Sequence, residues 1–278
     1  MGATKAGTSW LFRVLSDHPQ TQFRTIKELH YFDSLSAGKA DREIAAHQAA
    51  ISRMEVRIGS GDGSNLAYRS RYVADRLEYI ELLGRREIDT DAYSAFLSNG
   101  APAGAVLGDF TPAYGLLPAD ILGQMAILTD DVRFLYVLRD PVERLWSHVR
   151  MIAARRAPDD GATPDRAVRI LRRTLRGEEE EIARRGAYGD ILRRLTGALP
   201  ADRLHLAVFE EMVRPGGLTG ICSALDIRPI AGERTKPAHV GPPLPLPEAL
   251  RSDAKAWLEP EYRAAAEALG RMPDAWSR

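Results

Sequence analysis

The sequence predicts an α/β fold in which a central parallel β-sheet is flanked by helices on both faces. Three short apolar segments are typical of buried strands: 105–107, 132–138 and 204–209. Helical patterns separate these segments along the chain, and such alternation indicates β-α-β units with a mainly parallel sheet. The 278 residues can bury a full hydrophobic core. Because no repeat or linker interrupts the pattern, we expect residues 1–278 to form a single domain.

Composition and charge exclude several classes of protein. Lys and Arg number 38, as do Asp and Glu, so no excess charge predicts a nucleic-acid partner or an acidic membrane surface. The single cysteine, Cys222, excludes an intramolecular disulfide and a cysteine-based zinc site, and its apolar neighbours predict a buried structural thiol. No apolar run is long enough to span a membrane and no signal peptide is recognisable, so we expect a cytoplasmic protein of unspecified oligomeric state.

The first element is a glycine-rich loop, GATKAGTS, which is followed by a predicted helix over 9–17. Gly2 and Gly7 have the spacing of the Walker A motif, GxxxxGK[ST], and the N–H groups of such a turn bind anions. The motif's lysine is replaced by Thr8, while Lys5 lies inside the loop. The loop therefore suits a donor with one 5′-phosphate and one transferable group better than a triphosphate, and Lys5 can neutralise the leaving phosphate oxygen. The alternative is a glycine-rich turn that binds no ligand. The expected donor-binding residues are Lys5, Ala6, Gly7, Thr8 and Ser9.

A second candidate anion site follows the strand predicted over 132–138. Arg139 stands at its carboxyl end, where open α/β sheets bind ligands, and a guanidinium can bind a phosphate with two hydrogen bonds. Asp140 and Pro141 are the residues expected at the N-cap and first position of the next helix. Ser147 lies about two turns into that helix and can reach the same anion if the chain folds back. The alternative is a surface Arg–Asp pair.

The third informative stretch is KELHYFD, residues 27–33, which carries two candidate bases. On an extended segment Glu28 and His30 share a face, and either can take a proton from an acceptor hydroxyl or amine. The alternative is an exposed charged turn between core aromatic residues.

In their order along the chain, these stretches resemble those of the sulfotransferases that use 3′-phosphoadenosine-5′-phosphosulfate (PAPS). GATKAGTSWL looks like their 5′-phosphosulfate loop, and Arg-Asp-Pro followed by Ser147 resembles their 3′-phosphate site. KELHYFD is similar to the KE-x-HFFD-like stretch of the heparan-sulfate type and related bacterial enzymes. The resemblance implies sulfuryl transfer from PAPS to a hydroxyl or amine of a carbohydrate, lipid or small-molecule acceptor, with no metal ion.

The resemblance also implies roles for single residues. Glu28 matches the proposed base, with His30 as the alternative base or as a partner that orients Glu28. Lys27 would hold the sulfuryl oxygens, and Trp10 matches an aromatic residue near the adenine, with core packing as the alternative. The further positions that it implies are Tyr188, Arg234 and Lys236 for the nucleotide, and Asp109 and Tyr114 for the acceptor.

The sequence departs from these relatives at its start, because they place a full buried strand before the loop and here only Met1 precedes Gly2. We therefore expect a truncated first strand, which would leave its neighbours in the sheet without a partner. Two other functions stay open. The chain could be a P-loop kinase of a small molecule, although an acidic residue rather than Arg139 would then be expected at the strand end, or a non-catalytic nucleotide-binding protein.

Overall fold

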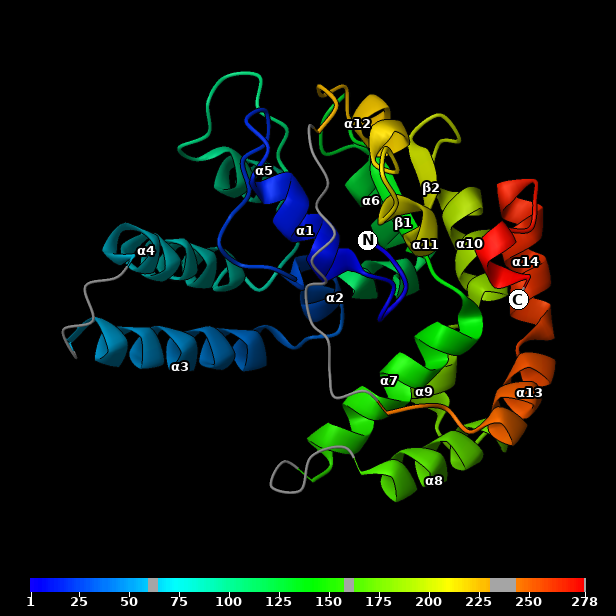
Figure 1. Ribbon diagram of the computed structural model, residues 1–278. Coiled ribbons are helices and arrows are strands. Elements are labelled where there is room, and N and C mark those ends of the chain that lie inside the picture. The colour runs from blue at the N-terminus through cyan, green and yellow to red at the C-terminus, as the bar shows by residue number, and fades with distance from the viewer. Residues whose placement is uncertain (60–64, 158–162, 231–243, 278) are drawn as a thin grey trace.

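The computed structural model describes residues 1–59, 65–157, 163–230 and 244–277, which form a mixed α/β fold (Figure 1). Among them, strands β1 (Phe134–Leu138) and β2 (Leu204–Val208) lie parallel at the centre of the molecule. Phe134 is paired with Leu204 and Leu138 with Val208. The α/β class and the two longer predicted strands are confirmed.

The first three residues lie beside β1 on the edge opposite β2. The N–H of Ala3 donates to the Val137 carbonyl at 3.0 Å, and Gly2 forms a parallel bridge with Val137. The Met1 amino group donates to the Leu135 carbonyl at 3.0 Å. This short segment therefore takes the place expected for the first strand, and β1 has hydrogen-bonded neighbours on both sides.

The strand expected over 105–107 is not formed, and this expectation was wrong. The segment contributes one parallel bridge, between Thr21 and Val106. The segment is only partly buried and begins directly after Gly104, which has a φ of 76°. A three-residue apolar segment between turns offers too few ladder positions for a strand of its own.

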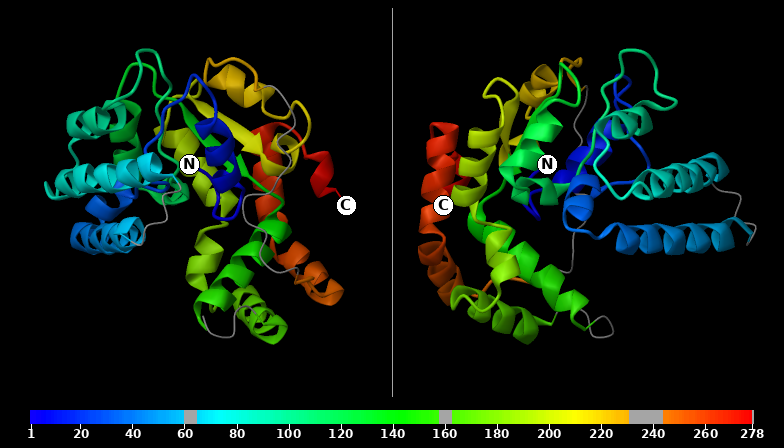
Figure 2. Two further views of the ribbon diagram at one scale, coloured as in Figure 1. Left: turned by 60° about the vertical axis from the view of Figure 1, so that its left-hand side comes forward. Right: turned by 180° about the vertical axis from the view of Figure 1, so that it is seen from behind.

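Helices supply most of the remaining structure. The helices of the described residues are α1 (Thr8–Ser16), α2 (Tyr31–Ser36), α3 (Ala40–Gly59), α4 (Leu66–Leu83), α5 (Thr90–Ser98), α6 (Ala119–Ala126), α7 (Pro141–Arg155), α8 (Pro164–Leu175), α9 (Glu180–Arg184), α10 (Tyr188–Ala198), α11 (Phe209–Met212), α12 (Thr219–Ala224), α13 (Glu248–Trp257) and α14 (Glu259–Leu269), with 3₁₀ turns at Pro112–Leu116 and Asp274–Trp276. Figure 2 shows α3 and α4 projecting as a helical pair from one side of the sheet, with α7 and α8 beyond its lower end. None of these helices is long and apolar enough to cross a membrane.

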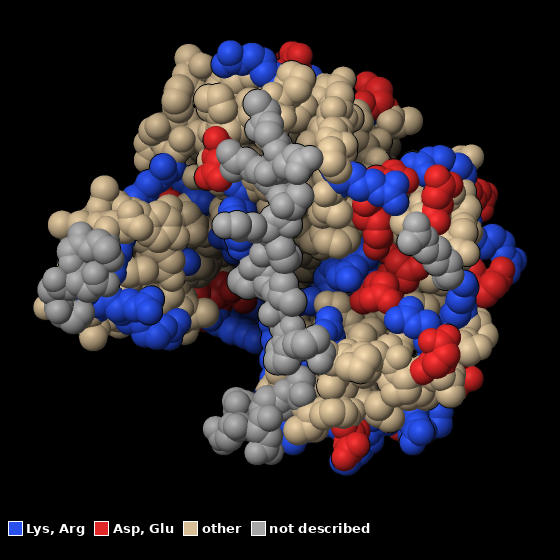
Figure 3. Space-filling model, in the orientation of Figure 1, with Lys and Arg blue, Asp and Glu red and all other residues tan. Residues whose placement is uncertain are grey.

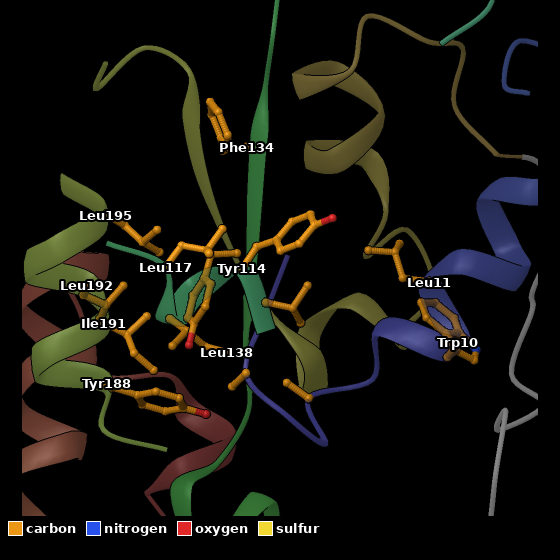
Figure 4. Packing of buried hydrophobic residues seen from close by; sticks show 14 of the residues in the cluster. Trp10, Leu11, Tyr114, Leu117, Phe134, Leu138, Tyr188, Ile191, Leu192 and Leu195 are labelled. Carbon is orange, nitrogen blue, oxygen red and sulfur yellow. The ribbon is translucent and has the colours of Figure 1, made fainter. Parts of the chain in front are cut away.

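The core surrounds β1 on both faces. Trp10 and Leu11 of α1 lie on one side of the strand, and Ile191, Leu192 and Leu195 of α10 lie on the other (Figure 4). Burial of such apolar side chains supplies the main stabilisation, at roughly 25 cal/mol per Å². The expected buried thiol is confirmed, since Cys222 is 1% exposed. The packing of α1 against β1 holds the loop before α1 next to the end of this strand.

Candidate functional site

The loop before α1 has a backbone that depends on two residues with positive φ. Lys5 has a φ of 75° and Gly7 a φ of 88°. A Cβ at Gly7 would lie 2.1 Å from Cδ2 of Phe209, so glycine is required both for its conformation and for space. The Ala6 N–H donates to the Ala3 carbonyl at 3.0 Å, which closes the turn. Helix α1 then begins at Thr8, and the first N–H groups of a helix have no partner within it.

Arg139 brings the second predicted anion site onto this loop. Its Nη1 donates to the Lys5 carbonyl at 3.1 Å, and its Cζ lies 5.1 Å from the centroid of the Phe209 ring. Its Nε is buried without a hydrogen-bond partner among the described residues, and lies 3.9 Å from Oε1 of Glu210. A guanidinium has five N–H donors, and the bond to Lys5 uses one of them, so the partly exposed Arg139 side chain keeps donor capacity for an anion.

Several positively charged side chains lie near enough to Lys5 to affect its pKa. Burial lowers the pKa of Lys5, the positive charges of Arg139, Arg155 and Arg150 lower it further, and Glu28 opposes them. Arg150 and Arg155 belong to α7, the helix that also carries the half-buried Ser147. Lys and Arg side chains border the hollow between the α3–α4 pair and α7 in the space-filling view (Figure 3). An anion placed beside Lys5 would relieve this repulsion.

The candidate-base segment does not have the extended form in which Glu28 and His30 would share a face. Glu28 has a φ of 63° and His30 a φ of 58°, and α2 begins at Tyr31. Left-handed backbone at residues other than glycine costs of order 1–3 kcal/mol, so surrounding contacts must impose it. The two side chains still meet, because His30 Nε2 lies 3.7 Å from Glu28 Oε2.

The contacts that impose this backbone come from Asp109 and its neighbours. Asp109 Oδ1 accepts from the Leu29 N–H at 3.4 Å, and the Thr111 hydroxyl accepts from the His30 N–H at 3.3 Å. The Tyr114 hydroxyl accepts from the Tyr31 N–H at 2.9 Å and donates to Asp109 Oδ2 at 2.6 Å. Tyr114 is only 2% exposed. The structure thus places Asp109 and Tyr114 behind the segment as its support, whereas the sequence placed them against the acceptor.

The charges around Glu28 assign its protonation state. Lys27 Nζ forms an ion pair with Glu28, and His30 Nδ1 lies 2.8 Å from Oδ2 of Asp33. Burial raises the pKa of Glu28, but the contact with His30 and the charge of Lys27 outweigh it and lower that pKa to about 2. Burial lowers the pKa of His30, but Asp33 and Glu28 outweigh it and raise that pKa to about 10. At neutral pH Glu28 is therefore an ionised carboxylate, while His30 is a cation that cannot accept a proton.

The remaining predicted residues lie in different places. Trp10 is 5% exposed and packs in the core, as its alternative interpretation stated. Tyr188 is fully buried, and its hydroxyl contacts the main chain of Arg139 instead of an open surface. Arg234 and Lys236 lie outside the described residues. No group of three or more His, Cys, Asp or Glu side chains in the described part of the chain is arranged to hold a metal ion.

Sequence reasoning missed Phe209 and Glu210. Phe209 supports the loop under Gly7, and Glu210 Oε1 accepts from the Asp140 N–H at 3.1 Å. Trp276 Nε1 in turn donates to Oε2 of Glu210 at 2.9 Å. A signal was present, because Phe209 ends the predicted strand 204–209 and Glu210 directly follows it, and the carboxyl ends of parallel strands meet at one edge.

The chain matches no family model and no curated protein. Among solved structures it is similar to the crystal structure of a sulfotransferase from Alicyclobacillus acidocaldarius, with a TM-score of 0.64 and 21% sequence identity. The similarity covers 100% of this chain and 97% of the other. The described part of the chain therefore has a sulfotransferase-like fold.

Proposed function

We propose that the protein is a sulfotransferase that moves a sulfuryl group from PAPS to a hydroxyl or amine of an acceptor, such as a carbohydrate, a lipid or a small molecule. The observation that carries this proposal is the contact between the two anion sites, where Arg139 Nη1 reaches the Lys5 carbonyl at 3.1 Å. One nucleotide with phosphates at both its 5′ and 3′ positions can use both sites at once. The sulfotransferase-like fold supports the same function.

The residues around the loop fit such a donor. Thr8 and Ser9 offer main-chain N–H groups at the start of α1 together with their hydroxyls, which suits the 5′-phosphosulfate. Arg139, whose side chain is 22% exposed, suits the 3′-phosphate, and Ser147 adds a hydroxyl from α7. We assign the Ala6 N–H to closing the turn, because it already donates to the Ala3 carbonyl.

The chemistry needs a base on one side and a cation on the other. PAPS supplies the sulfuryl group; the acceptor oxygen or nitrogen bonds to sulfur as the bond from sulfur to the 5′-phosphate oxygen breaks. Glu28 takes the acceptor's proton, and Lys5 balances the charge that develops on the leaving phosphate. Glu28 is close enough to Lys5 for its charge to raise the pKa of that lysine, so both groups act within one site.

Lys27 links proton transfer to donor binding. A carboxylate with a pKa of about 2 is a weak base, and the ion pair with Lys27 contributes to that low value. When Lys27 turns to the sulfuryl oxygens, Glu28 loses a positive neighbour and its pKa rises. Glu28 thus becomes a better base when the donor is present, and His30 remains the cation that orients it.

Calorimetry without an acceptor tests the proposal. Adenosine 3′,5′-bisphosphate should bind tightly in the absence of metal ions, and ATP with Mg²⁺ should bind weakly. A preference for ATP with Mg²⁺ would favour a small-molecule kinase and overturn the proposal. Tight binding of the bisphosphate without sulfuryl transfer to any of a panel of hydroxyl and amine acceptors would instead indicate a non-catalytic nucleotide-binding protein.

A further inference from the structure

The main chain of Arg139 is held by the side chain of Tyr188. The Arg139 N–H donates to the Tyr188 hydroxyl at 3.1 Å, and the same hydroxyl donates to the Arg139 carbonyl at 2.8 Å. The Tyr188 side chain is completely buried. The hydroxyl uses its proton and one lone pair in hydrogen bonds to Arg139. Because the side chain is buried, it has no exposed surface that could contact a nucleotide.

Close packing places Tyr188 at this position. The turn before α10 contains Gly186, where a Cβ would lie 1.8 Å from Nη2 of the buried Arg144. Glycine therefore allows the turn to lie directly on Arg144. At the start of α10, the Gly189 N–H donates to Oε2 of Glu261 on α14 at 2.9 Å. Contacts within the protein therefore hold Tyr188 in place, and no bound ligand is needed.

The residue after Arg139 is held from other directions. Oδ1 of Asp140 accepts from the Glu143 N–H at 2.9 Å, and its Oδ2 accepts from the Tyr262 hydroxyl at 2.8 Å. The Asp140 N–H donates to Glu210 at 3.1 Å. The main chain from Arg139 to Asp140 therefore has little freedom, and the direction of the Arg139 side chain is fixed at its Cα.

We propose that Tyr188 is a positioning residue that clamps the Arg139 peptide groups and so aims the guanidinium at the 3′-phosphate of the donor. This inference rests on the proposed function. The clamp acts through Arg139, so it favours ligands that carry a 3′-phosphate and is indifferent to ligands that lack one. A tyrosine that contacted the adenine would instead affect all adenine nucleotides equally.

The test replaces the hydroxyl alone. Tyr188→Phe keeps the ring, and Tyr136→Phe is the matched control, because Tyr136 is also fully buried and its hydroxyl has no partner among the described residues. Affinities for adenosine 3′,5′-bisphosphate and for 5′-AMP are measured by calorimetry on both variants, with thermal unfolding to show that each is folded. Tyr188→Phe should weaken bisphosphate binding about tenfold, as expected for the loss of hydrogen bonds that orient a charged group, and change 5′-AMP binding less than about twofold. Tyr136→Phe should change neither.

The outcomes separate the clamp from the proposed function. Equal losses for the two ligands in Tyr188→Phe, or no loss for either, would overturn the clamp while leaving the donor site in place. A wild-type protein that binds the bisphosphate no better than 5′-AMP would overturn the 3′-phosphate assignment and the clamp with it.

Hydrogen exchange in the wild-type protein tests the clamp without any variant. The Arg139 amide should be protected before ligand is added, because its N–H already donates to a buried hydroxyl. Rapid exchange of that amide in the folded, ligand-free protein would overturn the proposal.

Discussion

The two halves of the candidate site are built in different ways. The donor half, the loop before α1 and the turn after β1, is shaped by main chain next to the sheet and by a glycine that leaves room for Phe209. The acceptor half, residues 27–33, has non-glycine residues in left-handed conformations, held by side chains of Asp109, Thr111 and Tyr114. The comparison teaches that the loop before α1 depends on its own backbone and on the space beside Phe209, whereas the candidate base depends on hydrogen bonds to side chains 80 to 83 residues further along the chain.

The substitution with the largest expected effect removes the candidate base, Glu28, from the acceptor half. Glu28→Gln should lower turnover by about 10²- to 10⁴-fold, because general-base catalysis contributes that much. Its affinity for adenosine 3′,5′-bisphosphate should stay within about threefold of the wild-type value, because the amide keeps the shape of the carboxylate. Single-turnover kinetics and calorimetry measure the two effects. A variant with full activity would remove Glu28 from the mechanism.

Arg139→Ala tests the donor half. It should weaken bisphosphate binding by about 10- to 100-fold and leave 5′-AMP binding nearly unchanged, since hydrogen bonds to a charged group contribute about 1.5–3 kcal/mol. Arg193→Ala is the control, because this side chain is 77% exposed and pairs with Asp190 on the outer face of α10. Equal weakening of both nucleotides would remove Arg139 from the 3′-phosphate site.

Asp109→Asn tests whether the support behind the acceptor half is separate from the donor half. The carboxylate accepts from the hydroxyls of Tyr93, Tyr114 and Thr111, so the substitution should lower the free energy of unfolding by about 1–3 kcal/mol. Turnover should fall while bisphosphate affinity is retained. The control is Asp131→Asn, whose side chain is 77% exposed and which should be neutral in chemical denaturation. Loss of donor affinity in Asp109→Asn would show that the two halves are not independent.

The pH dependence of turnover is the smallest expected effect, and it distinguishes Glu28 from His30 as the base. With a Glu28 pKa of about 2, turnover should hold as the pH falls from about 8 to about 5, because the carboxylate stays ionised. His30→Gln removes a neighbouring cation, so the pKa of Glu28 should rise toward 4.5 and the acid limb of the profile should move upward. A wild-type rate that falls on acidification through about pH 10 would indicate His30 as the base, because the pKa of His30 is raised to about 10.

The free energy of unfolding should depend on the ionisation of His30 and Glu28, and the two groups should give opposite dependences on pH. The folded pKa of His30 is raised from 6.5 to about 10, so its contribution is complete below pH 6.5 and is lost as the pH rises through about 10. The folded pKa of Glu28 is lowered from 4.5 to about 2, so its contribution is present above pH 4.5 and is lost as the pH falls through about 2. Denaturation of His30→Gln across this range should show a smaller loss at alkaline pH than the wild-type protein.

The sequence predicted the backbone elements of the donor half better because their signals are local. Gly7 precedes a helix, and Asp140 and Pro141 follow a strand, so neighbouring residues define both turns. The supports of the site are contacts between distant parts of the chain, such as Tyr188 with Arg139 and Tyr114 with Tyr31. Sequence patterns identified these tyrosines but assigned them to ligands, because a pattern does not show which hydroxyl is buried. The same limit applies to residues 105–107, whose apolar character indicated a strand that has almost no ladder.

The central claim is that the loop and the strand end bind one donor through two phosphates. The most direct measurement compares the wild-type affinities for adenosine 3′,5′-bisphosphate, 5′-AMP and 3′-AMP under the same metal-free conditions. We predict that the bisphosphate binds at least about 100-fold more tightly than either monophosphate, because engagement of the second phosphate becomes intramolecular once the first is bound. An affinity for the bisphosphate no greater than that for the better monophosphate would contradict the account.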